Sequence, residues 1–110
     1  MNIADVLSVD RVKAAYAQIG VPPRRGSWSC NDKTCAIGAV FRAERGKKPM
    51  EPEEVAAYLG VPLAQVVNFI FGFDSPNPLL GMANTPSGVR EAYEHGRAIA
   101  AEVFSAGAPV

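Results

Sequence analysis

The two cysteines of this chain are the residues most suited to covalent or redox chemistry. Cys30 and Cys35 have four residues between them, and Lys33 is one of these. A thiolate near a helix start and a cation is stabilised, so Cys35 could serve as a redox-active thiol or a nucleophile. Because free cysteines are commonly buried side chains without chemistry, we expect Cys35 in the core and Cys30 in a loop.

A single histidine, His95, is the residue that could complete a dyad or a metal site with these thiols. Zinc needs four ligands, so two cysteines would require His95 and either Asp32 or Asp74 to converge with them. His95 follows Glu91 by four residues, a spacing typical of an exposed helix face. The chain has no phosphate-binding glycine loop, nucleophile elbow or paired-histidine motif. We therefore predict a non-enzymatic protein with no catalytic residue, no metal and no cofactor.

Residues 52–71 have the pattern of a helix-turn-helix hairpin, with Gly60 at the hinge between two short helices. Its apolar or small positions are Val55, Ala56, Leu59, Val61, Val66 and Phe69. In a DNA-binding protein, the second helix presents polar or basic side chains to base edges and phosphates. Only Gln65 and Asn68 in this second helix could contact an adenine edge.

The charges around the hairpin are unfavourable for DNA. No lysine or arginine lies between Lys48 and Arg90. Three acidic residues stand at the start of the hairpin: Glu51, Glu53 and Glu54. Since DNA affinity depends mainly on cationic contacts with phosphates, we expect a protein partner or a homodimer rather than DNA.

A basic pair, Arg24 and Arg25, precedes the only tryptophan, Trp28, in a loop rich in proline and glycine. Arginine beside an indole can contact phosphates and stack on a base, so these arginines are also DNA-contact candidates. An indole is a large apolar surface to leave in water. We therefore expect Trp28 to anchor this loop to the core while the arginines stay solvated.

The 110 residues carry no net charge, but the charge is unevenly distributed. Residues 1–48 have nine Lys and Arg against four Asp and Glu, and residues 49–110 have two against seven. We expect these halves to attract each other within one fold rather than to form a nucleic-acid face. No apolar run approaches the roughly 18–20 residues of a membrane span, and no secretory signal is recognisable. The sequence thus favours a cytoplasmic protein with reduced thiols and no membrane partner.

The first half of the chain is predicted to contain two helices. Ser8 is a suitable N-cap for the first, whose apolar stripe ends at Gly20. Thr34 is a suitable N-cap for the second, over residues 35–45, and Gly46 ends it.

The second half is predicted to contain the hairpin and a last helix. Pro52 starts the hairpin, and the long irregular tract 72–84 after it is a candidate for recognition or for ordered packing. Thr85 begins the last helix, Gly107 ends it, and the tail at 106–110 is expected to be frayed.

The segment 34–43, which contains Cys-Ala-Ile-Gly-Ala, resembles a helix of small uncharacterised bacterial helical domains, where it follows a Trp-containing loop. Residues 69–74 are similar to the aspartate-containing turn at the end of a later helix in those domains. Phe73 stands where asparagine often precedes the aspartate, and the loop after it is longer here. The resemblance covers about a third to a half of the chain and implies a helical bacterial domain without a known activity.

These patterns predict an all-α single domain, a compact bundle of four to five helices containing the hairpin. The predicted core is Val12, Tyr16, Ile37, Val40, Phe41, Val55, Leu59, Val66, Phe69, Tyr93 and Val103. The favoured function is a non-enzymatic binding or interaction module. The alternatives are a helix-turn-helix DNA-binding regulator and a thiol-dependent redox or catalytic protein that uses Cys35.

Overall fold

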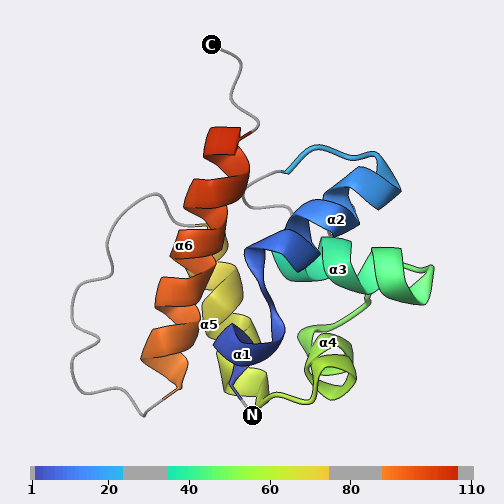
Figure 1. Ribbon diagram of the computed structural model, residues 1–110. Coiled ribbons are helices and arrows are strands. Elements are labelled where there is room, and N and C mark those ends of the chain that lie inside the picture. The colour runs from blue at the N-terminus through green and yellow to red at the C-terminus, as the bar shows by residue number, and fades with distance from the viewer. Residues whose placement is uncertain (1, 24–34, 75–87, 107–110) are drawn as a thin grey trace.

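The computed structural model describes residues 2–23, 35–74 and 88–106, and these ranges contain helices and no strand (Figure 1). The helices are α1 Ile3–Val6, α2 Val9–Ile19, α3 Ala36–Arg45, α4 Pro52–Leu59, α5 Leu63–Asp74 and α6 Val89–Ala106. The all-α prediction is confirmed. Six helices lie in the described ranges, one more than the upper limit predicted.

The additional helix is the four-residue α1. A single helical turn is unstable by itself, so α1 depends on packing rather than on helix propensity. Ile3 within α1 and Leu7 just after it are both buried, and α1 contacts α6. Because this stabilisation comes from a distant helix, periodicity in the first eight residues did not reveal it.

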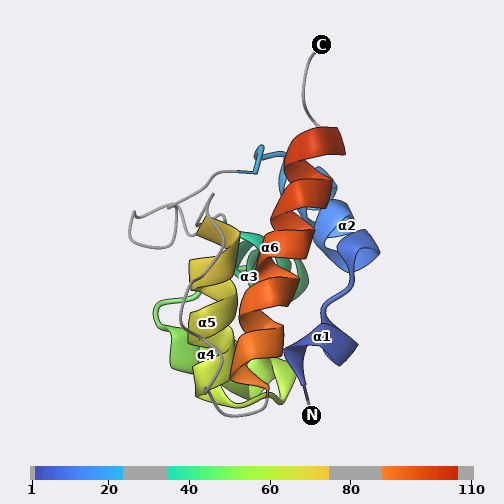
Figure 2. The same cartoon turned by 90° about the vertical axis from the view of Figure 1, so that its left-hand side faces the viewer.

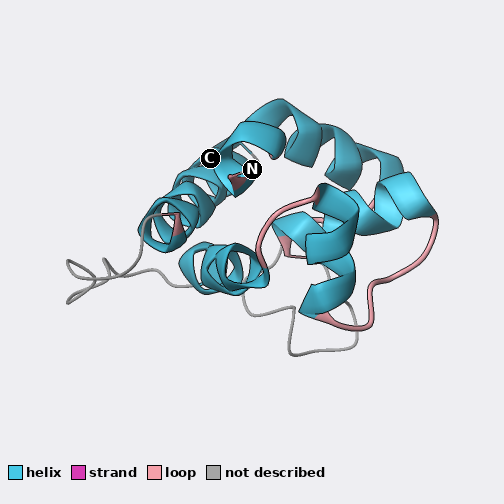
Figure 3. Ribbon diagram, turned by 90° about the horizontal axis from the view of Figure 1, so that it is seen from below, coloured by secondary structure: helices cyan, strands magenta, loops and turns pink. Residues whose placement is uncertain are grey.

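The helices are arranged around two main contacts, α5 against α6 and α2 against α3. Figure 2 shows α6 lying along α5, with α4 near the lower end of α5. The view from below in Figure 3 shows the helical elements joined by loops. The α5–α6 pair thereby forms one side of the core, and α2, α3 and α4 complete it.

Capping and helix-breaking residue types in the sequence predicted most helix boundaries. The Ser8 hydroxyl accepts a hydrogen bond from the Arg11 N–H at 3.1 Å, and Gly20 ends α2. Pro52 begins α4, as expected for a residue without an N–H. Gly60 ends α4 with a φ of 72°, a conformation that glycine adopts without strain.

Three helix boundaries differ from the prediction. The last helix, α6, begins at Val89, after Gly88, and not directly after Thr85. The N-cap of α3 is Cys35, so this helix begins at Ala36, one residue later than expected. The second helix of the hairpin runs to Asp74 instead of ending at residue 71. Gly72 therefore lies inside α5, where it contacts α6, and does not end the helix.

All eleven residues of the predicted core are buried. The three- and four-residue periodicity of each helix was sufficient to identify them. Other predicted features lie outside the described residues: Arg24, Arg25, Trp28, Cys30, Thr34, Thr85, Gly107, residues 75–84 of the long tract and residues 107–110 of the tail.

Candidate functional site

The α4–α5 hairpin has the geometry of a helix-turn-helix. The chain turns through 113° between the two helices, and the three residues Gly60, Val61 and Pro62 connect them. Helix-turn-helix motifs join their helices at about 90–120° with a turn of similar length. The hinge predicted at Gly60 is therefore present.

Within the described ranges, no individual helix has the length and apolar character needed to cross a membrane. The α4–α5 pair meets those criteria only when both helices are taken together across their sharp bend.

Gln65, one of the two amides of the second helix named as DNA-contact candidates, points into the fold. Its side chain is 5% exposed. The Gln65 Oε1 accepts a hydrogen bond from the Ile3 N–H at 2.8 Å, and its Nε2 donates to Asn2 Oδ1 at 3.0 Å. Both ends of the Gln65 amide therefore bind the N-terminal segment.

Asn68, the second amide of this helix, is half-buried. Its Nδ2 donates a hydrogen bond to the Ala64 carbonyl oxygen at 2.8 Å, one turn earlier in α5. This bond uses one of the two Nδ2 hydrogens and ties the amide to its own helix. DNA contact by Asn68 stays a prediction, as does contact by Arg24 and Arg25, which lie outside the described residues.

The outer side of α5 is apolar. Leu63 is 41% exposed and Phe71 is 59% exposed, while Val67 between them is half-buried. These residues are four apart, so they follow one another along a single helix face. The helix contains no lysine, arginine or glutamate, and its one acidic residue is Asp74 at the end. We call Leu63, Val67 and Phe71 the α5 stripe.

The opposite side of α5 is held against α6 by two glycines. A Cβ atom at Gly72 would lie 2.1 Å from the Tyr93 carbonyl oxygen, and one at Gly96 would lie 2.3 Å from the Phe69 carbonyl oxygen. The two backbones therefore approach more closely than any side chain permits. The sequence predicted residue 72 as the first of the irregular tract after the hairpin, whereas Gly72 packs inside α5 against α6. This contact fixes which face of α5 is buried.

Aromatic rings extend the same interface. Phe73 of α5 lies 5.4 Å from Phe104 of α6 and 6.4 Å from Phe69, measured between ring centroids. Phe69 and Phe73 are fully buried. Large rings on the buried side anchor α5, so the α5 stripe is presented to solvent on a rigid helix.

His95 also differs from its predicted position. Its ring is half-buried, 5.8 Å from the Phe69 ring between centroids. The Nε2 atom lies 2.5 Å from the Leu7 carbonyl oxygen, so the N–H at that position donates to the backbone just after α1. The exposed Glu91–His95 pair expected from spacing is therefore wrong. Glu91 instead accepts a hydrogen bond from the Gly88 N–H at 2.6 Å, which stabilises the start of α6.

Cys35 is fully buried. Burial raises the pKa of the Tyr16 hydroxyl, and the neighbouring Cys35 and Asp74 raise it further. In the described part of the chain, no three His, Cys, Asp or Glu side chains gather as a metal site would require. The other thiol, Cys30, lies outside the described residues.

The buried position of Cys35 leads to a prediction about its reactivity. In a Cys30→Ser variant, Cys35 is the only thiol. We expect an aromatic disulfide reagent to label it at least about 100-fold more slowly in the native protein than in the urea-unfolded chain, because labelling requires opening of the core. Native labelling at the unfolded rate would contradict this expectation and support the thiol-dependent alternative.

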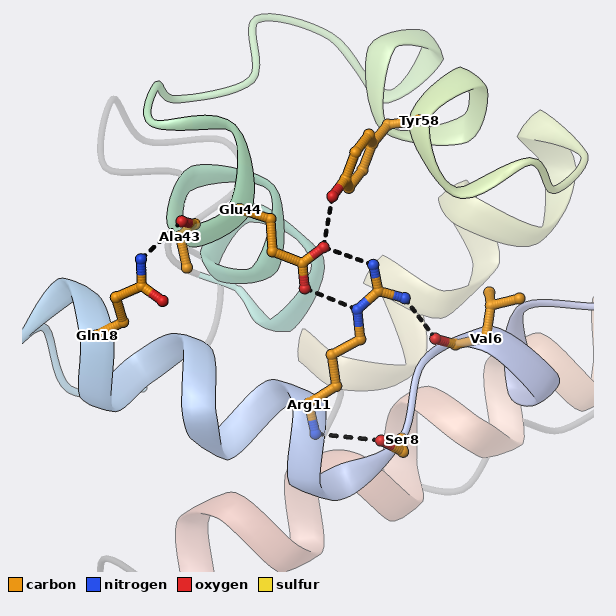
Figure 4. A network of polar contacts seen from close by, with 7 residues as sticks. All are labelled: Val6, Ser8, Arg11, Gln18, Ala43, Glu44 and Tyr58. Atoms are coloured by element: carbon orange, nitrogen blue, oxygen red, sulfur yellow. Dashed lines mark hydrogen bonds and ion pairs between the residues drawn. The ribbon is translucent and has the colours of Figure 1, made fainter.

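A polar network joins α4, the first helix of the hairpin, to α2 and α3 (Figure 4). Arg11 binds both carboxylate oxygens of Glu44, through Nε at 2.8 Å and Nη2 at 2.6 Å. Its Nη1 donates to the Val6 carbonyl oxygen at 2.6 Å, and the Tyr58 hydroxyl donates to Glu44 at 2.5 Å. These contacts fix α4 relative to α2 and α3, and so orient the first helix of the hairpin.

The network predicts a pH-dependent contribution to stability. The hydrogen bond from Arg11, with that from Tyr58, lowers the pKa of Glu44 below its ordinary value of 4.5. The stabilisation is therefore complete above that value and is lost as the pH falls through the lowered pKa of the folded state. We expect Glu44→Gln to reduce the free energy of unfolding by about 1 kcal/mol near neutral pH, since the pair is partly exposed.

Urea unfolding of wild type and Glu44→Gln across the acidic range checks this prediction. The difference between the two proteins should shrink once the pH is below 4.5. A difference that stayed constant into strong acid would show that the Glu44 charge is not its source.

Among the residues that the structure describes, an ion pair joins the two oppositely charged halves of the chain. In this pair, Lys47 Nζ lies 3.9 Å from Glu54 Oε2. Two other described pairs, Arg11–Glu44 and Arg90–Glu94, each lie within one half. Attraction between the halves therefore stays a prediction.

Comparison of the chain with protein-family models, curated proteins and solved structures found no match. The function must therefore be inferred from the chemistry of the hairpin and its surroundings.

Proposed function

We propose that this protein is a non-enzymatic interaction module that forms a homodimer through the α5 stripe. The observation that carries the proposal is the row of apolar side chains at Leu63, Val67 and Phe71, with Phe71 59% exposed. Large apolar side chains grouped on one exposed face are typical of interaction surfaces. The close α5–α6 contact keeps this face turned outward.

A second copy of the chain is the occupant that fits this surface best. A two-fold dimer brings each surface patch against the same patch of its partner, so a charged patch would repel itself. The α5 stripe has no charge, and Asp74 is the only ionisable residue of the helix. Three side chains bury much less than the roughly 800 Å² per partner of a standard interface. We therefore expect a weak dimer, with a dissociation constant on the order of 100 µM.

An NMR dilution series tests the position of the interface. As the concentration falls through the dissociation constant, amide resonances of α5 around Val67 and Phe71 should shift together. Those of Lys13 and Gln18 on the exposed side of α2 should stay unchanged. Concentration-dependent shifts confined to other helices would contradict the proposal.

The hinge geometry supports DNA binding as a second candidate function. The 113° turn and the three-residue connection are those of a DNA-binding helix-turn-helix. The absence of a cation on α5 and the internal bonds of Gln65 favour the dimer instead. DNA binding predicts duplex affinity at low salt that falls steeply as salt is added, and no binding at low salt would exclude it.

A further inference from the structure

A groove on a different surface has the chemistry of an anion site. It lies between the end of α3, the connection to α4 and the outer side of α4, and its volume is about 440 Å³. Its lining residues are Phe41, Arg45, Lys47, Glu54, Ala57 and Tyr58. No residue of α5 lines it, so it is independent of the α5 stripe and of the proposed dimer.

Arg45 is positioned in this groove by an aromatic ring. Its guanidinium lies over the Tyr58 ring, 5.4 Å from the centroid. Tyr58 is itself held by its hydrogen bond to Glu44 and by edge contact with Phe41, at 5.6 Å between centroids. Within the described residues, Arg45 has this ring contact and no ion pair. Its N–H groups therefore keep their hydrogen-bonding capacity for an oxyanion in an orientation that the ring fixes.

Lys47 supplies a second cation in the same groove. Its side chain is 63% exposed, and its Nζ lies 3.9 Å from Glu54 Oε2, at the outer limit of an ion pair. The other oxygen of Glu54 accepts a hydrogen bond from the Met50 N–H at 2.7 Å. Glu54 is thus held by the backbone, while the Lys47 ammonium is free to turn its hydrogens toward a ligand.

We propose that this groove binds a small organic phosphate, with the phosphate monoester between Arg45 and Lys47. Arg45 and Lys47 supply two cations against the one carboxylate of Glu54, so the groove is net positive and attracts a dianionic phosphate more strongly than a singly charged carboxylate. Arginine forms paired hydrogen bonds to phosphate oxygens. Ala57 and the rings of Phe41 and Tyr58 provide apolar contact for the carbon part of the ligand. The volume is within the range of small-molecule sites, about 300–1,000 Å³.

The surrounding charges select a small ligand over a nucleic acid. Glu51 and Glu53 are exposed at the start of α4, and Glu54 lines the groove. An extended polyanion would lie across all three carboxylates and be repelled, whereas a single phosphate between the two cations has only Glu54 of these as a neighbour in the groove.

NMR titration with phenyl phosphate tests the proposal, with inorganic phosphate and benzoate as comparison ligands at constant ionic strength. We expect saturable shifts of the Arg45 side-chain Nε–H and of the Lys47 amide, with a dissociation constant on the order of 1 mM for phenyl phosphate. Inorganic phosphate should bind several-fold more weakly, because it makes no apolar contact. Benzoate should be weaker still, because it carries one charge.

Four variants separate specific binding from a general charge effect. Arg45→Gln and Lys47→Gln should each weaken phenyl phosphate binding by about 5–10-fold, and Arg45→Lys should give an intermediate loss. Arg90→Gln removes the same charge from α6 and should leave binding unchanged. Folding of each variant is checked by its amide spectrum, and Lys47 is exposed enough to be replaced without disturbing the core.

Three results would overturn the proposal. The first is the absence of saturation by phenyl phosphate at about ten times the expected dissociation constant. The second is an equal loss of binding in Arg90→Gln and Arg45→Gln. The third is tighter binding of a short DNA duplex to the same groove, which would assign it to a nucleic-acid backbone. None of these results depends on dimerisation, so failure here and failure of the α5 dimer are distinguishable.

Discussion

Gly96→Ala is expected to lower the free energy of unfolding by about 3 kcal/mol. The added Cβ would lie 2.3 Å from the Phe69 carbonyl oxygen and 2.9 Å from the Phe73 backbone nitrogen. Both contacts are with backbone atoms, so no side chain can rotate to relieve them. The helices α5 and α6 must move apart, and the packing of Phe73 against Phe104 loosens.

Urea and thermal unfolding measure this effect, with Gly60→Ala as the matched control. A Cβ at Gly60 meets no atom within 4 Å, so its cost arises only from the φ of 72° and should be about 1 kcal/mol. Gly72→Ala should resemble Gly96→Ala, because its Cβ would lie 2.1 Å from the Tyr93 carbonyl oxygen. If Gly96→Ala cost no more than Gly60→Ala, the close α5–α6 approach would be contradicted.

Gln65→Leu is expected to lower the free energy of unfolding by about 2–3 kcal/mol. The substitution places an apolar side chain of similar size in the interior but removes the acceptor of the buried Ile3 N–H. It also removes the donor to Asn2 Oδ1. An unpaired buried N–H retains its full desolvation cost, so the N-terminal helix α1 should detach from α5 more readily.

Hydrogen exchange at the Ile3 amide reports this detachment directly, alongside urea unfolding. Ile3 should lose protection in Gln65→Leu while Phe69, in the middle of α5, keeps most of its own. Asn68→Leu is the control, since it replaces the same kind of amide where the bond to Ala64 is exposed, and should change stability by less than about 0.5 kcal/mol. An unchanged Ile3 exchange rate in Gln65→Leu would refute the role assigned to this side chain.

Features of the fold that depend on neighbouring residues were predictable from the sequence. Ser8, Pro52 and Gly60 act within one helical turn, so their residue types indicate helix ends directly. The core followed from the repeat of apolar residues along each helix. The hinge of the hairpin was predictable for the same reason.

Features that depend on distant partners were not predictable. Gln65 has the residue type of an exposed amide, but it binds the Ile3 N–H from 62 residues away. His95 contacts the Leu7 carbonyl oxygen across 88 residues, so its four-residue spacing from Glu91 was misleading. Gly72 resembled a helix end because glycine is used both there and at close helix contacts, and only the position of α6 distinguishes the two uses.

These contacts between residues far apart in the sequence also determine which side chains of the hairpin are exposed to a partner. By holding Gln65 inward, the N-terminal segment buries one of the two amides that the sequence offers for contact with DNA. By approaching α5 at two glycines, α6 fixes the apolar residues Leu63 and Phe71 on the solvent side. The hairpin thus combines the geometry of a DNA-binding motif with a surface suited to apolar association.

Sedimentation equilibrium tests the proposed homodimer through the α5 stripe most directly. The proteins compared are wild type, Phe71→Glu and Met50→Glu. Phe71→Glu places like charges opposite each other in a two-fold dimer, whereas Met50, 81% exposed in the α3–α4 connection, provides an equal charge change outside the α5 stripe. We predict a monomer–dimer equilibrium in wild type and Met50→Glu, with a dissociation constant on the order of 100 µM, and a monomer in Phe71→Glu. A wild-type protein that remains monomeric at about 1 mM, or a Phe71→Glu variant that dimerises as well as wild type, would contradict it.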